Sequence, residues 1–136
     1  MGASFDGGYV CRSDLLFESG ALDELDLQRL YGITGQYYRP LLDRFQQVGT
    51  SENNDTFTAK VITGGAKGLY TFFEAIVMRG TDGQLWVAYI DDEVVRYFTT
   101  EREFRERLPQ TVERWRDRFR GKNVVFANEI DVIPSV

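Results

Sequence analysis

The feature that most constrains this chain is a strand-like run that is apolar on both of its faces. Residues 84–90 read QLWVAYI, and every residue after Gln84 is apolar. A strand with one face in water alternates apolar and polar residues, whereas a run of this kind is typical of a central strand. We therefore expect a sheet that is covered on both sides.

Three further strand patterns surround this run, and turn-forming residues separate them. The strands are expected at residues 57–62, 69–78, 84–90 and 94–99. The turns are expected at residues 50–55 (TSENND), 64–68 (GGAKG), 80–83 (GTDG) and 91–93 (DDE). Strands joined by short turns pair with their neighbours in antiparallel order, which predicts a meander of four strands.

Two helices are expected before this meander. Residues 19–32 (SGALDELDLQRLYG) predict a short amphipathic helix, with acids near its start and Gly32 at its end. Residues 36–49 carry apolar side chains at spacings of three and four, and they predict a second helix with Pro40 in its first turn.

A third helix is expected after the meander. Thr100 and Glu103 have the spacing of a capping box, so the helix should run over residues 101–119 with a kink at Pro109. A final strand should follow from residue 123.

Together these elements predict an α+β fold. Its antiparallel sheet of about five strands, the meander of four plus a C-terminal strand, should pack against the two N-terminal helices and one kinked helix at about residues 100–120. We expect residues 1–136 to form one globular domain, with residues 1–12 as a loose N-terminal segment.

Composition excludes several classes of site. Cys11 is the only cysteine, so neither a disulfide nor a cluster of thiolate metal ligands can form within this chain. The chain contains no histidine, which excludes Ser-His-Asp triads, Cys-His pairs and histidine-based zinc sites. An enzyme would be left with carboxylate, Lys, Tyr or Ser chemistry, or with an oxygen-ligated ion such as Mg²⁺. We expect no cofactor and no metal.

The charge distribution favours a protein partner over nucleic acid. The chain has 16 basic and 21 acidic residues, yet residues 101–122 hold eight basic and five acidic ones. Glu–Arg pairs along the third helix should neutralise much of that local charge. The expected pairs are Glu101 with Arg105, Glu103 with Arg107 and Glu113 with Arg116. The remaining surface should repel nucleic acid and attract a basic partner.

Location is suggested by two further features. No apolar run approaches the ~20 residues of a membrane-spanning helix. The first residues, MGASFDGGYV, lack the basic-then-apolar order of a signal peptide. We expect a soluble, cytoplasmic chain without a membrane partner.

The acids Asp91, Asp92 and Glu93 are the first candidate site. They can form an exposed turn, an acidic contact for a partner, or an oxygen-ligand metal site. Three consecutive acids in a tight turn cannot all converge on one ion. The turn is therefore the favoured interpretation, with the partner contact second.

Glu74 is the second candidate, because it is the one charged residue in the strand expected at 69–78. A buried carboxylate with a raised pKa could act as an acid or base. An ion pair with Arg79 or Arg96 is the favoured alternative. The nearby GGAKG segment does not match a phosphate-binding P-loop, because Gly68 leads into a strand pattern and not into a helix.

The order of elements over residues 84–127, a hairpin, a helix and then the strand VVFA, resembles the C-terminal half of the Ivy-type periplasmic lysozyme inhibitors. The resemblance covers about a third of the chain. The inhibitory loop of that family, Cys-Lys-Pro-His-Asp-Cys, has no counterpart in a chain with one cysteine and no histidine. Lysozyme inhibition is therefore not expected.

The leading hypothesis is a non-enzymatic inhibitor, such as an immunity protein that neutralises a cognate toxin by direct binding. Acids would present charge to the partner and tyrosines would anchor it. The expected contact residues are Asp91, Asp92, Glu93, Tyr89, Tyr97, Tyr37 and Tyr38. The alternative is a small-molecule-binding or enzymatic α+β domain in which Glu74 faces a pocket. A third possibility is a subunit of a larger assembly.

Overall fold

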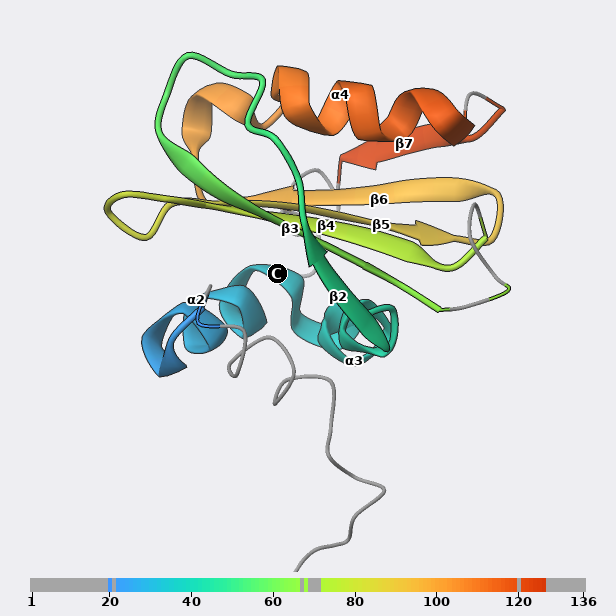
Figure 1. The fold of residues 1–136 in the computed structure, drawn as a ribbon, viewed down its shortest axis with the longest axis horizontal. Coiled ribbons are helices and arrows are strands. Elements are labelled where there is room, and N and C mark those ends of the chain that lie inside the picture. The colour runs from blue at the N-terminus through green and yellow to red at the C-terminus, as the bar shows by residue number, and fades with distance from the viewer. Residues whose placement is uncertain (1–19, 21, 67, 69–71, 120, 127–136) are drawn as a thin grey trace, which may run out of the picture.

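Helical layers lie on both sides of a six-stranded mixed sheet (Figure 1). The computed structural model describes residues 20, 22–66, 68, 72–119 and 121–126. The strands, in their order across the sheet, are β2 Gln47–Thr50, β3 Ala59–Gly65, β4 Glu74–Gly80, β5 Leu85–Asp91, β6 Val94–Thr99 and β7 Asn123–Phe126. Neighbouring strands from β2 to β6 are antiparallel, and β7 runs parallel to β6.

The predicted α+β class is confirmed, with two differences in the sheet. One strand more than expected is present, because β2 forms where a helix was predicted. The last strand is parallel to its neighbour because the chain crosses the sheet through helix α4 before it reaches β7 (Figure 1).

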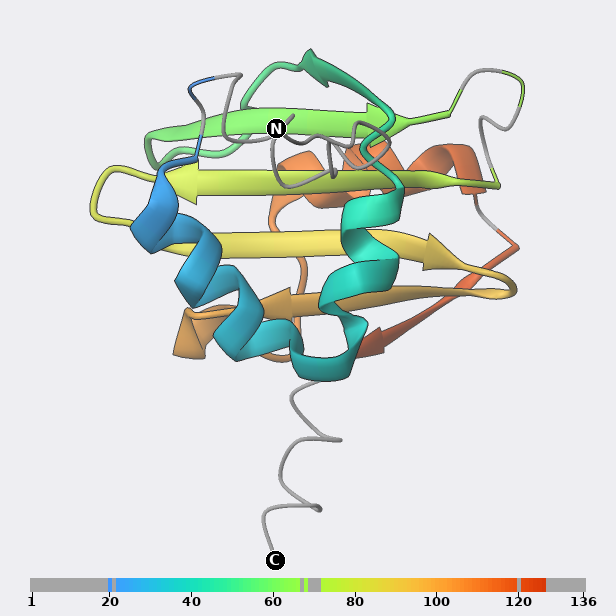
Figure 2. The same ribbon diagram turned by 90° about the horizontal axis from the view of Figure 1, so that it is seen from below.

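Each face of the sheet has its own hydrophobic core, and β5 contributes to both. Helices α2 (Glu24–Thr34) and α3 (Tyr38–Asp43) cover one face (Figure 2). Helix α4 (Gln110–Arg116) covers the other face. Leu85, Val87 and Tyr89 enter the first core, and Trp86, Ala88 and Ile90 enter the second. All of these residues are buried, so the expectation of a strand covered on both sides is confirmed.

The start of α2 is fixed within its own first turn. Asp26 N donates to Asp23 Oδ1 at 2.8 Å, and Asp23 N donates to Asp26 Oδ2 at 3.0 Å, which forms a capping box. The first of these hydrogen bonds lowers the pKa of Asp23. Asp26 is buried and also accepts from Arg79 Nε on β4 at 3.0 Å and from Arg29 Nη1 at 3.2 Å. The cap therefore also ties α2 to the sheet.

The second predicted helix, residues 36–49, ends earlier than expected. Helix α3 stops at Asp43, and Arg44 then donates two hydrogen bonds to the carbonyl oxygen of Ile90, at 3.1 and 2.9 Å. The helix prediction is wrong from residue 47 onward, because Gln47–Thr50 forms β2 and pairs with β3. The spacing of Phe45 and Val48 fits a helix, but the pairing with β3 decides the structure of this segment.

The third predicted helix is also shorter, and its predicted capping box is wrong. Thr100 Oγ1 accepts a hydrogen bond from Leu85 N at 2.9 Å, which continues the pairing of β6 with β5. A 3₁₀ turn over Arg102–Phe104 follows, Pro109 is extended, and α4 begins at Gln110. No α-helix spans residues 101–109, so the regular side-chain neighbours at a spacing of four that a helix provides are absent there. Of the three expected ion pairs, the described residues form Glu113–Arg116, at 3.7 Å, but not Glu101–Arg105 or Glu103–Arg107.

Candidate functional site

The acids at 91–93 form a tight turn, as the favoured interpretation predicts. Asp91 ends β5, and Asp92, with a φ of 58°, and Glu93 connect it to β6. Asp91 Oδ2 accepts from Arg96 Nε at 2.5 Å, and Lys122 Nζ donates to the carbonyl oxygen of Asp92 at 2.8 Å. Two cations thus reduce the negative charge of the turn. The described part of the chain contains no group of acids arranged to hold a metal ion.

The four predicted tyrosine anchors lie in two kinds of place. Tyr89 and Tyr97 are fully buried in opposite cores, so the structure leaves neither ring exposed to a partner. Tyr37 is half-buried and lies 4.6 Å from the guanidinium of Arg96, which also holds the acidic turn. Tyr38 is half-buried as well and packs at right angles against the exposed ring of Tyr31, at 5.2 Å. Of these four tyrosines, Tyr37 is the one that lies near the acidic turn and is also partly exposed.

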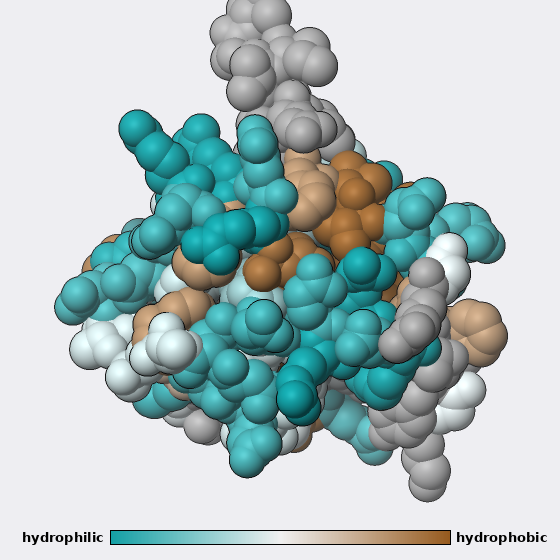
Figure 3. Space-filling view, turned by 90° about the horizontal axis from the view of Figure 1, so that it is seen from above, coloured by the Kyte–Doolittle hydropathy of each residue, from teal (hydrophilic) through white to brown (hydrophobic). Residues whose placement is uncertain are grey.

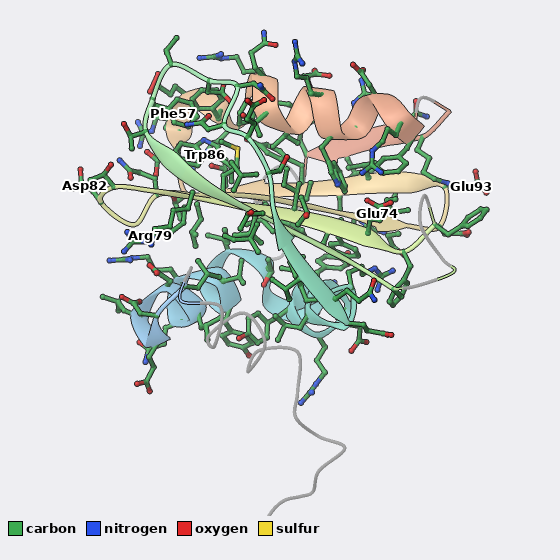
Figure 4. The ribbon with its side chains drawn as sticks, viewed as in Figure 1. Phe57, Glu74, Arg79, Asp82, Trp86 and Glu93 are labelled. Atoms are coloured by element: carbon green, nitrogen blue, oxygen red, sulfur yellow. The ribbon has the colours of Figure 1, made fainter. Side chains whose placement is uncertain are left out.

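Glu74 is a buried ion-pair partner, as the favoured alternative predicts, but its partner is a different arginine. Arg118 donates from Nη2 to Glu74 Oε1 at 2.6 Å and from Nη1 to Oε2 at 3.3 Å. Of the two arginines proposed from the sequence, Arg79 pairs with Asp26 on α2, and Arg96 with the acidic turn. Glu74 lies on the α4 side of the sheet (Figure 4).

Glu74 and Arg118 lie in the wall of an open cleft of about 590 Å³, which we name the β2–α4 cleft. Its floor is formed by β2, β3 and the start of β4. One side is formed by α4 and the turn after it, and the loop over residues 51–54 contributes one further border. The α4 residues in the lining are Thr111, Arg114 and Trp115.

The cleft exists because glycines occupy the floor of the sheet beneath α4. Two rows of paired residues run across β2, β3 and β4 and face α4. The rows are Gln47–Gly65–Glu74 and Gly49–Thr63–Ile76. Because directly paired residues point to the same face, two positions of this floor carry no side chain.

The GGAKG segment, predicted as a turn, therefore has another role at its start. Gly64 and Gly65 belong to β3, so this part of the prediction is wrong. Gly64 faces the other core, where a Cβ would overlap the buried ring of Phe45. Residue 67 lies outside the described residues.

The position of α4 above this floor depends on a residue far away in the sequence. Asp55, in the loop between β2 and β3, accepts hydrogen bonds from Gln110 N and Thr111 N, both at 2.9 Å, and from Thr111 Oγ1 at 2.6 Å. Pro109, the residue before α4, supplies no side-chain cap. Asp55 therefore caps α4 in place of a local residue. This role was not predicted from the sequence, although TSENND offers an acid and the residues before Gln110 offer no cap.

The cleft is polar, with charges of both signs in its lining. Arg118 is engaged by Glu74, whereas exposed Arg114 forms no ion pair within the described ranges. Glu52 is exposed on the loop. Trp115 packs edge-on against Phe119 at 5.0 Å, and its buried Nε1 has no hydrogen-bond partner in the part of the chain described. The surface seen from the α4 side is mainly hydrophilic (Figure 3). The side chains that line the cleft therefore favour contact with a polar ligand or a polar surface.

Comparison of the chain with protein-family models, with curated proteins and with solved structures finds no match. No helix in the described ranges has the length and apolar character needed to cross a membrane. The functional conclusion therefore rests on the geometry of the β2–α4 cleft and the surfaces beside it.

Proposed function

We propose that the protein is a non-enzymatic binding protein that inhibits a partner protein by direct contact, as an immunity protein neutralises a toxin. The observation that carries this proposal is the open β2–α4 cleft, which has an uncharged edge strand in its floor and arginines along the side formed by α4 and the turn after it.

The edge strand β2 has little protection against pairing. Among the described residues it has a strand neighbour on one side only, and three of its four residues are exposed. Natural edge strands are commonly protected by shortness, by lysine, by proline or by other charges. β2 is short, but the sequence Gln-Val-Gly-Thr contains no charge and no proline. Such an edge beside a cleft is a favourable contact for another chain.

The acidic turn supports the same proposal from a neighbouring position. Glu74 begins β4, and the pairing of Ala75 with Tyr89 places the start of β4 at the same end of the sheet as Asp91. Figure 4 shows Glu74 and Glu93 toward this same end. Asp92 and Glu93 are exposed there. With a net charge of −5 for the whole chain, these acids favour the approach of a basic protein.

A second candidate function, small-molecule binding, is favoured by the place of Glu74. This carboxylate lies in the cleft wall, and about 590 Å³ falls within the range of about 300–1,000 Å³ typical of ligand sites. A ligand of this kind should raise the melting temperature of the protein. A Glu74→Gln variant should lose that stabilisation.

Co-expression with the products of neighbouring genes tests the leading function. We expect one of them, secreted or nuclease-like, to co-purify in a stoichiometric complex and to lose its activity. Gly49→Val, which fills the cleft floor, and Arg114→Glu should weaken that complex. Arg105→Glu makes the same charge change at an exposed arginine outside the cleft and should leave it intact.

Failure of every neighbouring product to bind would remove the main support for the inhibitor. A metabolite that stabilises the wild-type chain but not Glu74→Gln would then favour the second function.

A further inference from the structure

The register of β2 shows which of its backbone groups face the open edge. Ser51 N donates to the carbonyl oxygen of Val61 at 3.1 Å, in the same register that pairs Gly49 with Thr63. Antiparallel partners alternate between hydrogen-bonded and non-hydrogen-bonded pairs. Gly49 and Thr63 therefore also form a hydrogen-bonded pair, whereas Val48 and Thr50 belong to non-hydrogen-bonded pairs. The N–H and C=O groups of Val48 and Thr50 therefore point away from β3.

These outward groups lie beside the cleft and not on a remote edge. Val48 and Thr50 both contribute to its lining, together with Arg114. Residues two apart in a strand are separated by about 6.5–7 Å, so the edge presents two donor–acceptor pairs at the repeat of an extended peptide. Gly49 between them has no side chain, and even a Cβ there would meet only Thr63 Oγ1, at 3.5 Å.

We infer that β2 takes an extended segment of a partner protein by β-strand addition, and that this segment carries an acidic side chain that pairs with Arg114. The inference rests on the proposed function and specifies which chemical groups of the partner make the contact. Main-chain hydrogen bonds to the edge strand supply affinity in this mode of recognition, and side-chain contacts supply specificity.

The charges in the lining of the cleft indicate which side chain the partner's segment should carry. Arg118 already holds Glu74 through two hydrogen bonds, whereas Arg114 is exposed and forms no ion pair within the described residues. A guanidinium is best matched by a carboxylate, which it can bind through two parallel N–H donors. An acidic residue in the segment therefore complements the one unmatched cation of the described lining.

A displayed library of random linear peptides of about 12 residues, selected on the full chain, tests the inference. Enriched peptides should share an acidic residue within an extended, proline-poor sequence. Thr50→Pro removes one outward N–H and leaves the hydrogen bonds between β2 and β3 in place, whereas Thr50→Val keeps that N–H. Binding should weaken by about tenfold or more in Thr50→Pro and in Arg114→Glu. It should stay within about twofold in Thr50→Val and in Arg105→Glu.

Hydrogen exchange gives a second measurement that needs no variant, in case Thr50→Pro does not fold. The amides of Val48 and Thr50 in the wild-type chain should exchange about tenfold or more slowly when an enriched peptide is bound. Failure to enrich any peptide, or enrichment of peptides that leave this exchange unchanged, would overturn the inference.

The two proposals can fail separately. A cognate protein that is still bound and inhibited by a folded Thr50→Pro variant overturns strand addition but leaves the inhibitor in place. Peptides that bind β2 as expected, in a chain that inhibits none of the neighbouring gene products, support strand addition and remove the proposed function.

Discussion

The helices that cover the two faces of the sheet are held in place in different ways. On one face, α2 is capped by its own first turn and is tied to β4 through the buried carboxylate of Asp26. On the other face, the seven-residue α4 is capped by Asp55 from a distant loop. The cleft in which Glu74 lies is on this second face. The helix on the first face is thus capped within its own first turn, whereas the helix on the second face depends on a distant loop, and the cleft that we propose as the binding surface lies beside it.

The largest expected loss of stability comes from a substitution on the face of the sheet that α2 covers. Asp26→Ala should lower the free energy of unfolding by about 3 kcal/mol, because it removes the carboxylate that Arg29 and Arg79 share and leaves the N–H of Asp23 without its partner. Urea denaturation followed by tryptophan fluorescence measures the change.

Asp82→Ala is the matched control, since Asp82 is exposed in the turn between β4 and β5 (Figure 4). Its effect should stay within about 0.5 kcal/mol. A loss of less than about 1 kcal/mol in Asp26→Ala would contradict the role given to this carboxylate.

Two glycines on adjacent strands face the two sides of the sheet. Gly64→Ala should destabilise the protein by about 2 kcal/mol, because the new Cβ overlaps the ring of buried Phe45 on the closed face. Gly49→Ala, on the cleft face, should change stability by less than about 0.5 kcal/mol, because its Cβ makes an ordinary contact with Thr63. Thermal unfolding of both variants checks the difference. Equal losses in the two would mean that the cleft floor is as tightly packed as the core.

The distant cap gives a smaller effect that is confined to one element. Asp55→Ala should cost about 1.5 kcal/mol, since Gln110 N and Thr111 N lose their acceptor. Hydrogen exchange should become faster in α4 and stay unchanged in α2. Glu52→Ala, in the same loop, is the control and should leave both helices unaffected.

The smallest effects are expected from two buried tyrosines, one in each core. Tyr97→Phe should cost about 1 kcal/mol, because Tyr97 Oη donates to the carbonyl oxygen of Phe104 at 2.9 Å. Tyr89→Phe should cost about 0 kcal/mol, since the buried hydroxyl of Tyr89 has no hydrogen-bond partner within the described residues. Denaturant unfolding at neutral pH measures the free energy of unfolding of both variants. A larger loss of stability in Tyr89→Phe than in Tyr97→Phe would contradict the hydrogen bonding described for the two hydroxyls.

High pH gives the same pair a second readout. Burial raises the pKa of Tyr89 from 10.0 to about 12, and it raises that of Tyr97 as well. Above pH 10 the unfolded chain has lost these protons while the folded chain retains them, so stability falls as the pH rises. Each Phe variant should lose less stability over this range than the wild-type chain.

Much of the fold could be predicted because its signals are local. The apolar run at residues 85–90 identified the central strand, and the acids at 91–93 identified the turn that follows. Val48 was misassigned because its spacing from Phe45 fits a helix as well as a loop and strand. Gly64 was misassigned because a glycine that makes room for a ring looks, in sequence, like a glycine in a turn.

The candidate site could be predicted only in part. Glu74 was identified because a single charge in an apolar strand is conspicuous, and an ion pair could be expected because a buried charge needs a partner. The identity of Arg118 as that partner depends on where α4 crosses the sheet, and that crossing depends on Asp55. No pattern within one segment contains such a relation, so the cleft appears only when the chain is folded.

The distant cap also has a consequence for the order of folding. Helix α2 can begin as soon as the chain collapses, because Asp23 and Asp26 are three residues apart. Helix α4 is too short to persist alone, and its cap must first bring together Asp55 and Gln110, which are 55 positions apart in the sequence. Contacts of such long range form late. We therefore expect the β2–α4 cleft, the surface that we propose to meet a partner, to be the last part of the molecule to fold.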